Sequence, residues 1–225
     1  MTTPLFPLPE QLTVPVLGES AAFPVHRIFC VGRNYAEHAR EMGNDPDREP
    51  PFFFTKPADA LVPDGAEVAF PRATGNLHHE VELVVAIGKG GADISTEAAP
   101  DHVWGYAVGN DLTRRDLQAE AKTLRRPWDM AKGFDASAVV GALHPVAAVG
   151  HPGDWAIRLE VNAILRQTGD LSEMIWSVPE IIAHLSGLVT LAPGDLIMTG
   201  TPAGVGPLER GDTCTATIAG LGRAE

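Results

Sequence analysis

The chain has 225 residues, of which 44% are hydrophobic and only two are cysteines, so we expect one substantial core that needs no disulfide framework. Its 29 acidic and 17 basic residues give a formal net charge of −12. An excess of negative charge repels nucleic acid and anionic membrane surfaces, so neither is an expected partner. Charged residues interrupt every apolar stretch long enough to span a bilayer, and we expect a cytoplasmic protein.

The expected elements begin with an extended, proline-rich arm over residues 1–25, and a single domain follows over residues 26–225. Residues 27–31 form an apolar run that predicts a short buried strand. A helix is expected over residues 35–42, with Asn34 as its N-terminal cap.

The clearest strand pattern covers residues 79–87, which are alternately polar and apolar at first and continuously apolar afterwards. A second strand over residues 104–108 leads to Asp111. Thr113 and Asp116 then resemble a capping box for a helix, which places Asp111 at a strand-to-helix corner.

The second half of the chain predicts a hairpin over residues 155–168 with its turn at residues 162–163. Residues 177–180 favour the start of an apolar helix that ends near Gly187, and a last strand is expected over residues 195–199. Strands outnumber helices and do not alternate with them regularly, so we predict an α+β fold with a mixed sheet and a few short helices.

Glu80 and Glu82 lie two residues apart on the predicted strand, so both carboxylates point to one face, together with His78. A solvent-facing strand edge would explain such a pair without any function. If Asp111 joins them, the three carboxylates provide hard oxygen ligands that suit Mg²⁺ or Mn²⁺ better than zinc.

His38 and Glu41 are three residues apart on the short predicted helix, where a carboxylate can orient an imidazole that acts as a base. An ordinary solvated helix face with surface ion pairs is the alternative interpretation.

Basic and amide side chains also lie near the acidic residues. Arg115, Gln118 and Lys122 share one face of the helix after Asp111, and Lys132 stands among apolar and aromatic residues. These groups either compensate the acidic charges, or Arg115 and Lys132 bind a carboxylate and stabilise an enolate.

Taken together, these segments resemble the fumarylacetoacetate hydrolase family, in particular its short acylpyruvate and fumarylpyruvate hydrolase members. The resemblance covers most of the chain in ordered motifs. The matching segments are residues 30–35, 38–42, 54–57, 78–83, 109–118, 127–128 with Lys132, 161–162, 166–167, 174–175, 199–202 and 204–207.

The resemblance implies a mixed β-roll of the family's C-terminal-domain type, usually dimeric, so we expect a homodimer. It implies that Glu80, Glu82 and Asp111 hold Mg²⁺ or Mn²⁺ and that His38 and Glu41 form the dyad that activates water. The domain over residues 26–225 is then the catalytic one.

The implied reaction is hydrolysis of a carbon–carbon bond in a small 2-oxo acid, most closely fumarylpyruvate, which arises from gentisate breakdown. The metal and Lys132 stabilise the pyruvate enolate in this hypothesis. Arg33, Gln118 and Thr201 are the expected substrate contacts, and Arg115 is expected to hold a substrate carboxylate or a metal-bound oxygen.

Two alternatives stay open at this point. The same scaffold serves oxaloacetate decarboxylation and the isomerisation or tautomerisation of 2-oxo acids, and a fold alone does not exclude a binding module without catalysis. Within the hydrolase hypothesis, Arg125 and Arg126 either meet a second substrate carboxylate or are solvated charges at the end of a helix.

Overall fold

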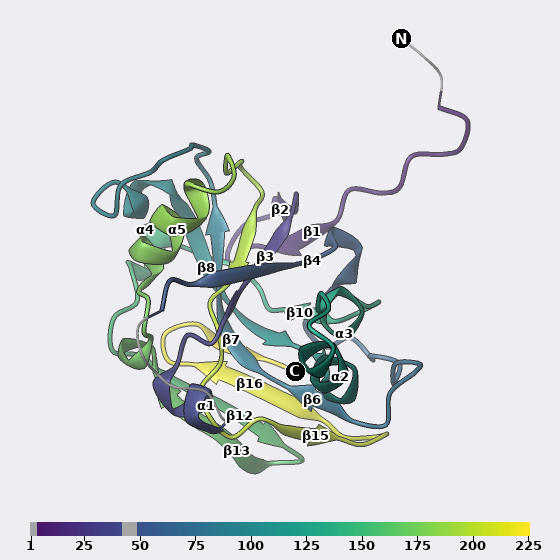
Figure 1. Ribbon diagram of the computed structural model, residues 1–225. Coiled ribbons are helices and arrows are strands. Elements are labelled where there is room, and N and C mark those ends of the chain that lie inside the picture. Colours follow the sequence, from purple (N-terminus) through teal and green to yellow (C-terminus); the bar gives the residue numbers. More distant parts are fainter. Residues whose placement is uncertain (1–3, 42–48) are drawn as a thin grey trace.

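A curled mixed β-sheet forms the centre of the computed structural model, which describes residues 4–41 and 49–225 (Figure 1). Its strands follow the order β4-β3-β14-β7-β8-β10-β5, with β11 paired to β8. β7 pairs antiparallel with β14 on one side and with β8 on the other. The strands of this sheet are β3 (Ile28–Gly32), β4 (Phe52–Lys56), β5 (Leu61–Pro63), β7 (Val81–Ile87), β8 (Val103–Asp111), β10 (Ala138–Val140), β11 (His144–Pro145) and β14 (Leu196–Met198).

Three smaller sheets surround this centre. A four-stranded sheet has the order β13-β12-β16-β17, a three-stranded one the order β15-β6-β9, and β1 and β2 form a two-stranded hairpin. Their bounds are β1 (Thr13–Pro15), β2 (Ala22–Pro24), β6 (Leu77–His79), β9 (Thr113–Arg114), β12 (Ala156–Val161), β13 (Ile164–Asp170), β15 (Gly206–Leu208), β16 (Cys214–Ile218) and β17 (Gly222–Ala224).

The helices are short and lie around the sheets rather than between consecutive parallel strands (Figure 1). They are α1 (Ala36–Glu41), α2 (Arg115–Thr123), α3 (Asp129–Lys132), α4 (Val146–Val149) and α5 (Val178–Ser186), with 3₁₀ turns η1 (Ala58–Ala60), η2 (Ala99–His102) and η3 (Leu171–Glu173). The predicted α+β class with a mixed sheet is therefore confirmed. In the described part of the chain, no helix has the length and apolar character needed to cross a membrane.

β7 is buried on both faces, which explains why its sequence is almost continuously apolar. Leu83 and Val85 pack in a core shared with β12, β16 and α5, whereas Val84 and Ala86 pack in a second core that includes the β1–β2 hairpin. The alternation of side chains along a strand thus divides this one strand between two cores. Packing against both cores therefore holds the first residues of β7, Val81 and Glu82, in place.

The expected strand over residues 79–87 is interrupted, because Glu80 lies between β6 and β7. The Glu80 amide donates to the Asn110 side chain at 2.9 Å, so the chain changes partner at this residue. The N-terminal segment also differs from a fully extended arm. Residues 13–24 include the β1–β2 hairpin, whose Val14 and Phe23 are buried.

Two predicted helix caps are wrong. Asn34 does not cap α1, because its buried amide donates to the Trp176 and Thr199 carbonyls and accepts from the Trp176 amide. Thr113 and Asp116 do not form a capping box either, because the Thr113 hydroxyl donates to the Asp111 carbonyl and the Asp116 carboxylate binds residues 74–75 and the Leu117 amide. Tertiary partners compete successfully with local capping at both places.

The hairpin turn at Asn162 and Ala163 is as predicted, with both residues at positive φ, +52° and +61°. The helix start at Ser177 is also as predicted, since the Glu180 carboxylate accepts hydrogen bonds from the Ser177 amide and hydroxyl.

We predict that Ala163→Gly stabilises the protein, because alanine is strained at positive φ and glycine is not. The free energy of unfolding should rise by about 0.5–1 kcal/mol. This net value already includes the opposing entropic cost of ordering a glycine, which is more flexible than alanine in the unfolded chain. Thermal denaturation measures this as a small increase in Tm. The control is Ala119→Gly at an exposed position of α2, which should lower Tm; a decrease for both variants would contradict the strain at the turn.

Candidate metal-dependent active site

Three carboxylates meet where β7 begins and β8 ends. The two strands are antiparallel, with Val81 opposite Asn110 and Glu82 opposite Gly109, so the start of β7 lies beside the last residues of β8. This register brings the carboxylate oxygens of Glu80, Glu82 and Asp111 within 4.8 Å of one another. All three residues are buried.

Three cations from separate elements surround two of these carboxylates. Lys132 Nζ, at the end of α3, lies 2.7 Å from both Glu80 Oε2 and Asp111 Oδ2. Lys56 Nζ, at the end of β4, lies 2.7 Å from Asp111 Oδ1, and the Arg115 guanidinium at the start of α2 pairs with Glu80 Oε1. Burial alone would raise the pKa of Glu80, but Lys132 and Arg115 hold it well below its usual value.

Glu82 has a different environment. Its carboxylate accepts a hydrogen bond from the Gly200 amide at 2.7 Å, and within residues 4–41 and 49–225 it has no cationic partner. Burial first, and the neighbouring Asp111 and Glu80 charges next, raise the pKa of Glu82 well above its usual value. A buried acid among acids with no counter-charge fits a divalent cation, and the all-carboxylate oxygen set suits Mg²⁺ or Mn²⁺.

His38 and Glu41 lie on α1, as the sequence predicts, and are in contact with each other. His38 Nδ1 is 3.3 Å from Glu41 Oε2, and Glu41 also accepts from the Gly204 amide at 3.1 and 3.2 Å. Burial lowers the pKa of His38, although the nearby Glu80 and Glu41 charges partly oppose this effect. The imidazole is therefore neutral at neutral pH and can accept a proton.

One small cavity of about 30 Å³ joins these groups. Its walls come from β3, β4, α1, α2, α3 and the segment after β14. The predicted site residues that line it are Arg33, His38, Glu80, Glu82, Arg115, Gln118, Lys132 and Thr201. Asp111 and Glu41 do not line it, but Asp111 contacts the lining residue Lys132 and Glu41 contacts His38.

The contacts of Arg115 are those of a counter-ion. Its guanidinium pairs with Glu80 and donates to Gln118 Oε1 at 2.7 Å and to His78 Nδ1 at 3.3 Å. Burial and the Arg115 charge lower the pKa of His78 to about 4, so His78 is neutral beside the cluster. Of the two alternatives weighed for Arg115, charge compensation is the one these contacts support.

Sequence reasoning assigned no role to Lys56 or Gln167, although both lie in matching motifs. Gln167, fully buried on β13, donates to Thr201 Oγ1 at 2.8 Å and to the Pro202 carbonyl at 2.9 Å, and its own oxygen accepts from His79. Lys56 is equally buried. Their strands gave no signal of burial, because Gln167 stands between Arg166 and Thr168 in a mostly exposed strand and Lys56 follows Thr55 at the end of a half-buried one; only their place in the matching motifs could have singled them out.

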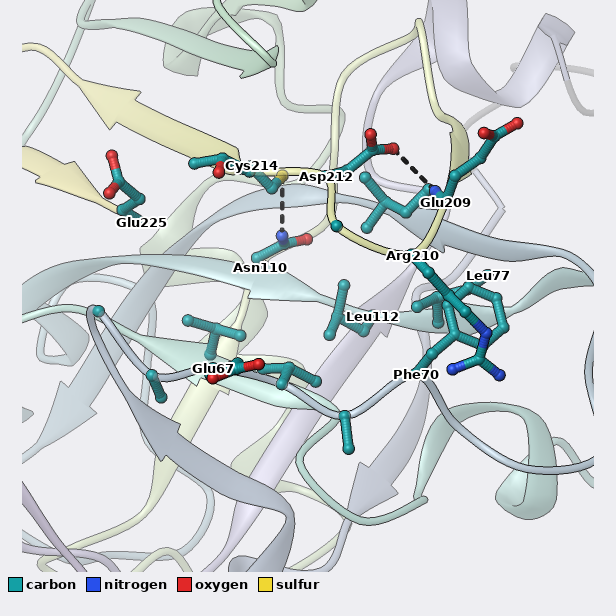
Figure 2. Close-up of a pocket in the computed structure, with 18 of the residues that line it drawn as sticks. Glu67, Phe70, Leu77, Asn110, Leu112, Glu209, Arg210, Asp212, Cys214 and Glu225 are labelled. Carbon is teal, nitrogen blue, oxygen red and sulfur yellow. Dashed lines mark hydrogen bonds between the residues drawn. The ribbon is translucent and has the colours of Figure 1, made fainter.

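A much larger cavity of about 640 Å³ lies elsewhere (Figure 2). Apolar side chains such as Phe70 and Leu77 line it, and Arg210 stacks on Phe70 with 4.6 Å between the guanidinium carbon and the ring centre. The Asn110 amide donates to Cys214 Sγ at 3.4 Å, and burial raises the pKa of this thiol to about 12. Its acidic residues, Glu67, Glu209, Asp212 and Glu225, form no cluster of three that could hold a metal ion among the described residues, so size does not identify the reactive site.

The buried triad could hold a divalent metal ion, and the His38–Glu41 pair offers a neutral imidazole at the same cavity. Residues 27–225 match the family model described as fumarylacetoacetate (FAA) hydrolase C-terminal. The chain belongs to this family, whose enzymes are hydrolases, tautomerases or isomerases, and the resemblance inferred from the sequence motifs is confirmed.

Two bacterial crystal structures and a human protein are among the similar proteins. Fumarylpyruvate hydrolase from Pseudomonas aeruginosa, in complex with Mn²⁺ and pyruvate, is 54% identical with a TM-score of 0.96 over 99% of this chain and 97% of that one. A putative fumarylpyruvate hydrolase from Burkholderia cenocepacia is 57% identical with a TM-score of 0.93, covering 100% and 94%. Human mitochondrial oxaloacetate tautomerase FAHD1 is 46% identical over 86% of this chain and 87% of its own.

We predict that Glu82→Gln stabilises the metal-free protein while weakening Mn²⁺ binding. The amide keeps an acceptor for the Gly200 amide and avoids the cost of burying an acid whose charged form is disfavoured there, so unfolding in excess chelator should cost about 1–3 kcal/mol more than in the parent protein. Mn²⁺ should raise the Tm of the parent protein but hardly that of the variant. Glu120→Gln, an exposed change on α2, is the control; a less stable metal-free Glu82→Gln protein would refute this account.

Proposed function

We propose that the protein hydrolyses an acylpyruvate, with fumarylpyruvate as its substrate and fumarate and pyruvate as products. The observation that carries this proposal is the position of His38, which lines the cavity between Glu41 and the carboxylate triad. The similarity to a fumarylpyruvate hydrolase that binds Mn²⁺ and pyruvate supports it.

In the proposed reaction His38 is the general base. Glu41 accepts a hydrogen bond from Nδ1–H of His38, which leaves Nε2 free to take a proton from water. The water then attacks the ketone carbon of the fumaryl group. Arg33, Gln118 and Thr201 line the cavity and are the proposed substrate contacts.

Attack on the ketone leads to cleavage of the carbon–carbon bond between the fumaryl carbonyl and the pyruvate methylene. The electron pair of this bond stays with the pyruvate fragment as an enolate, which takes a proton to give pyruvate, while the acyl fragment leaves as fumarate. Lys132 supplies a buried positive charge next to this position. A divalent cation held by Glu80, Glu82 and Asp111 would chelate the 2-oxo acid and stabilise the developing negative charge.

Oxaloacetate is the substrate of the second candidate function. The relatives named oxaloacetate tautomerase FAHD1, one of them human, support it. Tautomerisation and decarboxylation also pass through an enolate beside the same carboxylates, but neither requires an attacking water. A base such as His38 serves hydrolysis and also the proton transfer of tautomerisation, whereas decarboxylation needs none, so the dyad argues against decarboxylation as the principal reaction. The similarity to the fumarylpyruvate hydrolase structures is what favours hydrolysis over tautomerisation.

The proposal includes a homodimer that acts in the cytoplasm. The family resemblance supports the dimer. The acidic composition and two buried or half-buried free cysteines, Cys30 and Cys214, are consistent with a reducing compartment.

We predict that the protein releases pyruvate from fumarylpyruvate in the presence of Mg²⁺ or Mn²⁺ and that excess chelator removes this activity. Release from acetylpyruvate and oxaloacetate should be slower under the same conditions. A coupled assay for pyruvate measures all three substrates. Activity confined to oxaloacetate would replace the hydrolase proposal with the second candidate, and no activity on any of the three would favour a binding protein.

We predict that His38→Ala lowers hydrolysis of fumarylpyruvate by about 10²–10⁴-fold, because the general base is lost. Oxaloacetate decarboxylation should change by only a few-fold, because it needs no attacking water. Mn²⁺ affinity, measured by calorimetry, is the control for an intact triad. An equal loss of both activities would refute the role assigned to His38.

The pH dependence tests the same assignment. Because burial lowers the pKa of His38, the imidazole stays neutral below the usual value of 6.5. Hydrolysis should persist below that pH and fall only as the pH drops through the lowered pKa. This acidic limb should be absent from the residual activity of His38→Ala.

A further inference from the structure

Two positive charges at the cavity have no acidic partner in the described part of the chain. Lys122 on α2 and Arg33 after β3 both line the cavity beside the carboxylate triad. Neither forms an ion pair or a hydrogen bond through its charged group with a described residue, and Arg33 Nε is buried without any partner. By contrast, Arg115 and Lys132 in the same cavity are both engaged by Glu80.

Aromatic rings hold both side chains in place. Lys122 Nζ lies 5.2 Å from the ring centre of Trp128, and the Arg33 guanidinium carbon lies 5.2 Å from that of Phe52. Phe52 and Trp128 are themselves in edge-to-face contact, with 5.3 Å between their ring centres. The two cations are thus supported on a common aromatic wall.

The charges of Lys122 and Arg33 repel each other. Burial is the main cause that lowers the pKa of Lys122, followed by the positive charges of Arg115 and Arg33, and the Glu80 charge opposes this only in part. Arg33 also has a positive φ of +59°, an uncommon conformation for a side chain of this size. Two half-buried cations at one cavity, without a counter-ion among the described residues, favour the binding of an anion.

Lys122 and Arg33 line the same cavity as the triad residues Glu80 and Glu82 but form no ion pair with them. Lys122 follows Arg115 by seven residues on α2, which is about 10 Å along a helix axis. Arg115 pairs with Glu80, and Lys122 lies two turns farther along the helix. Arg125 and Arg126, which sequence reasoning considered for a second carboxylate, are exposed and do not line the cavity.

We propose that Lys122 and Arg33 bind the distal carboxylate of a dianionic 2-oxo acid whose other end is held at the triad. This assignment rests on the proposed function. It makes Lys122 a residue that determines specificity, because only an acyl group ending in a carboxylate uses its charge. Fumarylpyruvate carries that second carboxylate, whereas acetylpyruvate ends in a methyl group.

The kinetic test uses Lys122→Met, which keeps a long side chain against Trp128 but removes the charge. With the full-length, Mn²⁺-loaded protein, kcat/KM for fumarylpyruvate should fall by about 10–100-fold, which is the usual loss for one charge-assisted contact. Most of this fall should come from a higher KM. The kcat/KM for acetylpyruvate should change by less than about threefold. Lys122→Arg should restore most of the difference, and Arg126→Met, at an exposed arginine, should behave like the parent protein. Equal losses on both substrates would overturn the proposal.

A binding experiment distinguishes failure of this site from failure of the hydrolase proposal. 2-Oxoheptanedioate and 2-oxoheptanoate have seven carbons each, lack the cleavable diketone, and differ only in the distal carboxylate. By calorimetry, the Mn²⁺-loaded parent protein should bind the diacid at least about 10-fold more tightly, and Lys122→Met should lose this preference. That result would support the anion site even if fumarylpyruvate were not hydrolysed; equal affinity of the parent protein for the two acids would refute the site.

Discussion

The structure depends on a group of buried charges at the junction of β7 and β8. Three carboxylates and three cations are removed from water there, and each would be costly to bury alone. The register of the two strands fixes the carboxylates, and β4, α2 and α3 deliver Lys56, Arg115 and Lys132. The peripheral helices are therefore placed by electrostatic pairing as well as by apolar packing.

The three carboxylates in this group are not paired equally with cations, and this difference is related to the proposed function. Glu80 and Asp111 share all three cations, whereas the one partner of Glu82 in the described part of the chain is the Gly200 amide. Gly200 has a positive φ of +98°, and a Cβ there would lie 2.7 Å from Asn34, so this backbone donor requires glycine. The same segment bonds Glu41 through Gly204. One loop thus positions both a metal ligand and the partner of the proposed base.

Periodicity in the sequence was sufficient to place the acidic residues on strand ends and to predict the α+β class, because these depend on local patterns. It was not sufficient to show that Glu80 and Asp111 meet, since their contact depends on the pairing of β7 with β8; the family resemblance supplied that expectation. Lys56, Gln167 and Asn34 show the remaining limit. Their partners are remote in sequence, so no local rule assigns them, and the local rule for Asn34 predicted a helix cap that tertiary contacts replaced.

The chemistry of the triad is common to several reactions of a 2-oxo acid, because hydrolysis, decarboxylation and tautomerisation all develop an enolate at the same end of the substrate. Discrimination must then come from groups that contact the rest of the substrate or the water. In the proposed function those groups are His38 on α1 and the cations Lys122 and Arg33, which have no acidic partner among the described residues. An attacking water needs a base, and the second carboxylate of a diacid needs a cation that the triad does not already engage. Both features line one cavity, and the proposed substrate class, an acylpyruvate with a second carboxylate, uses both.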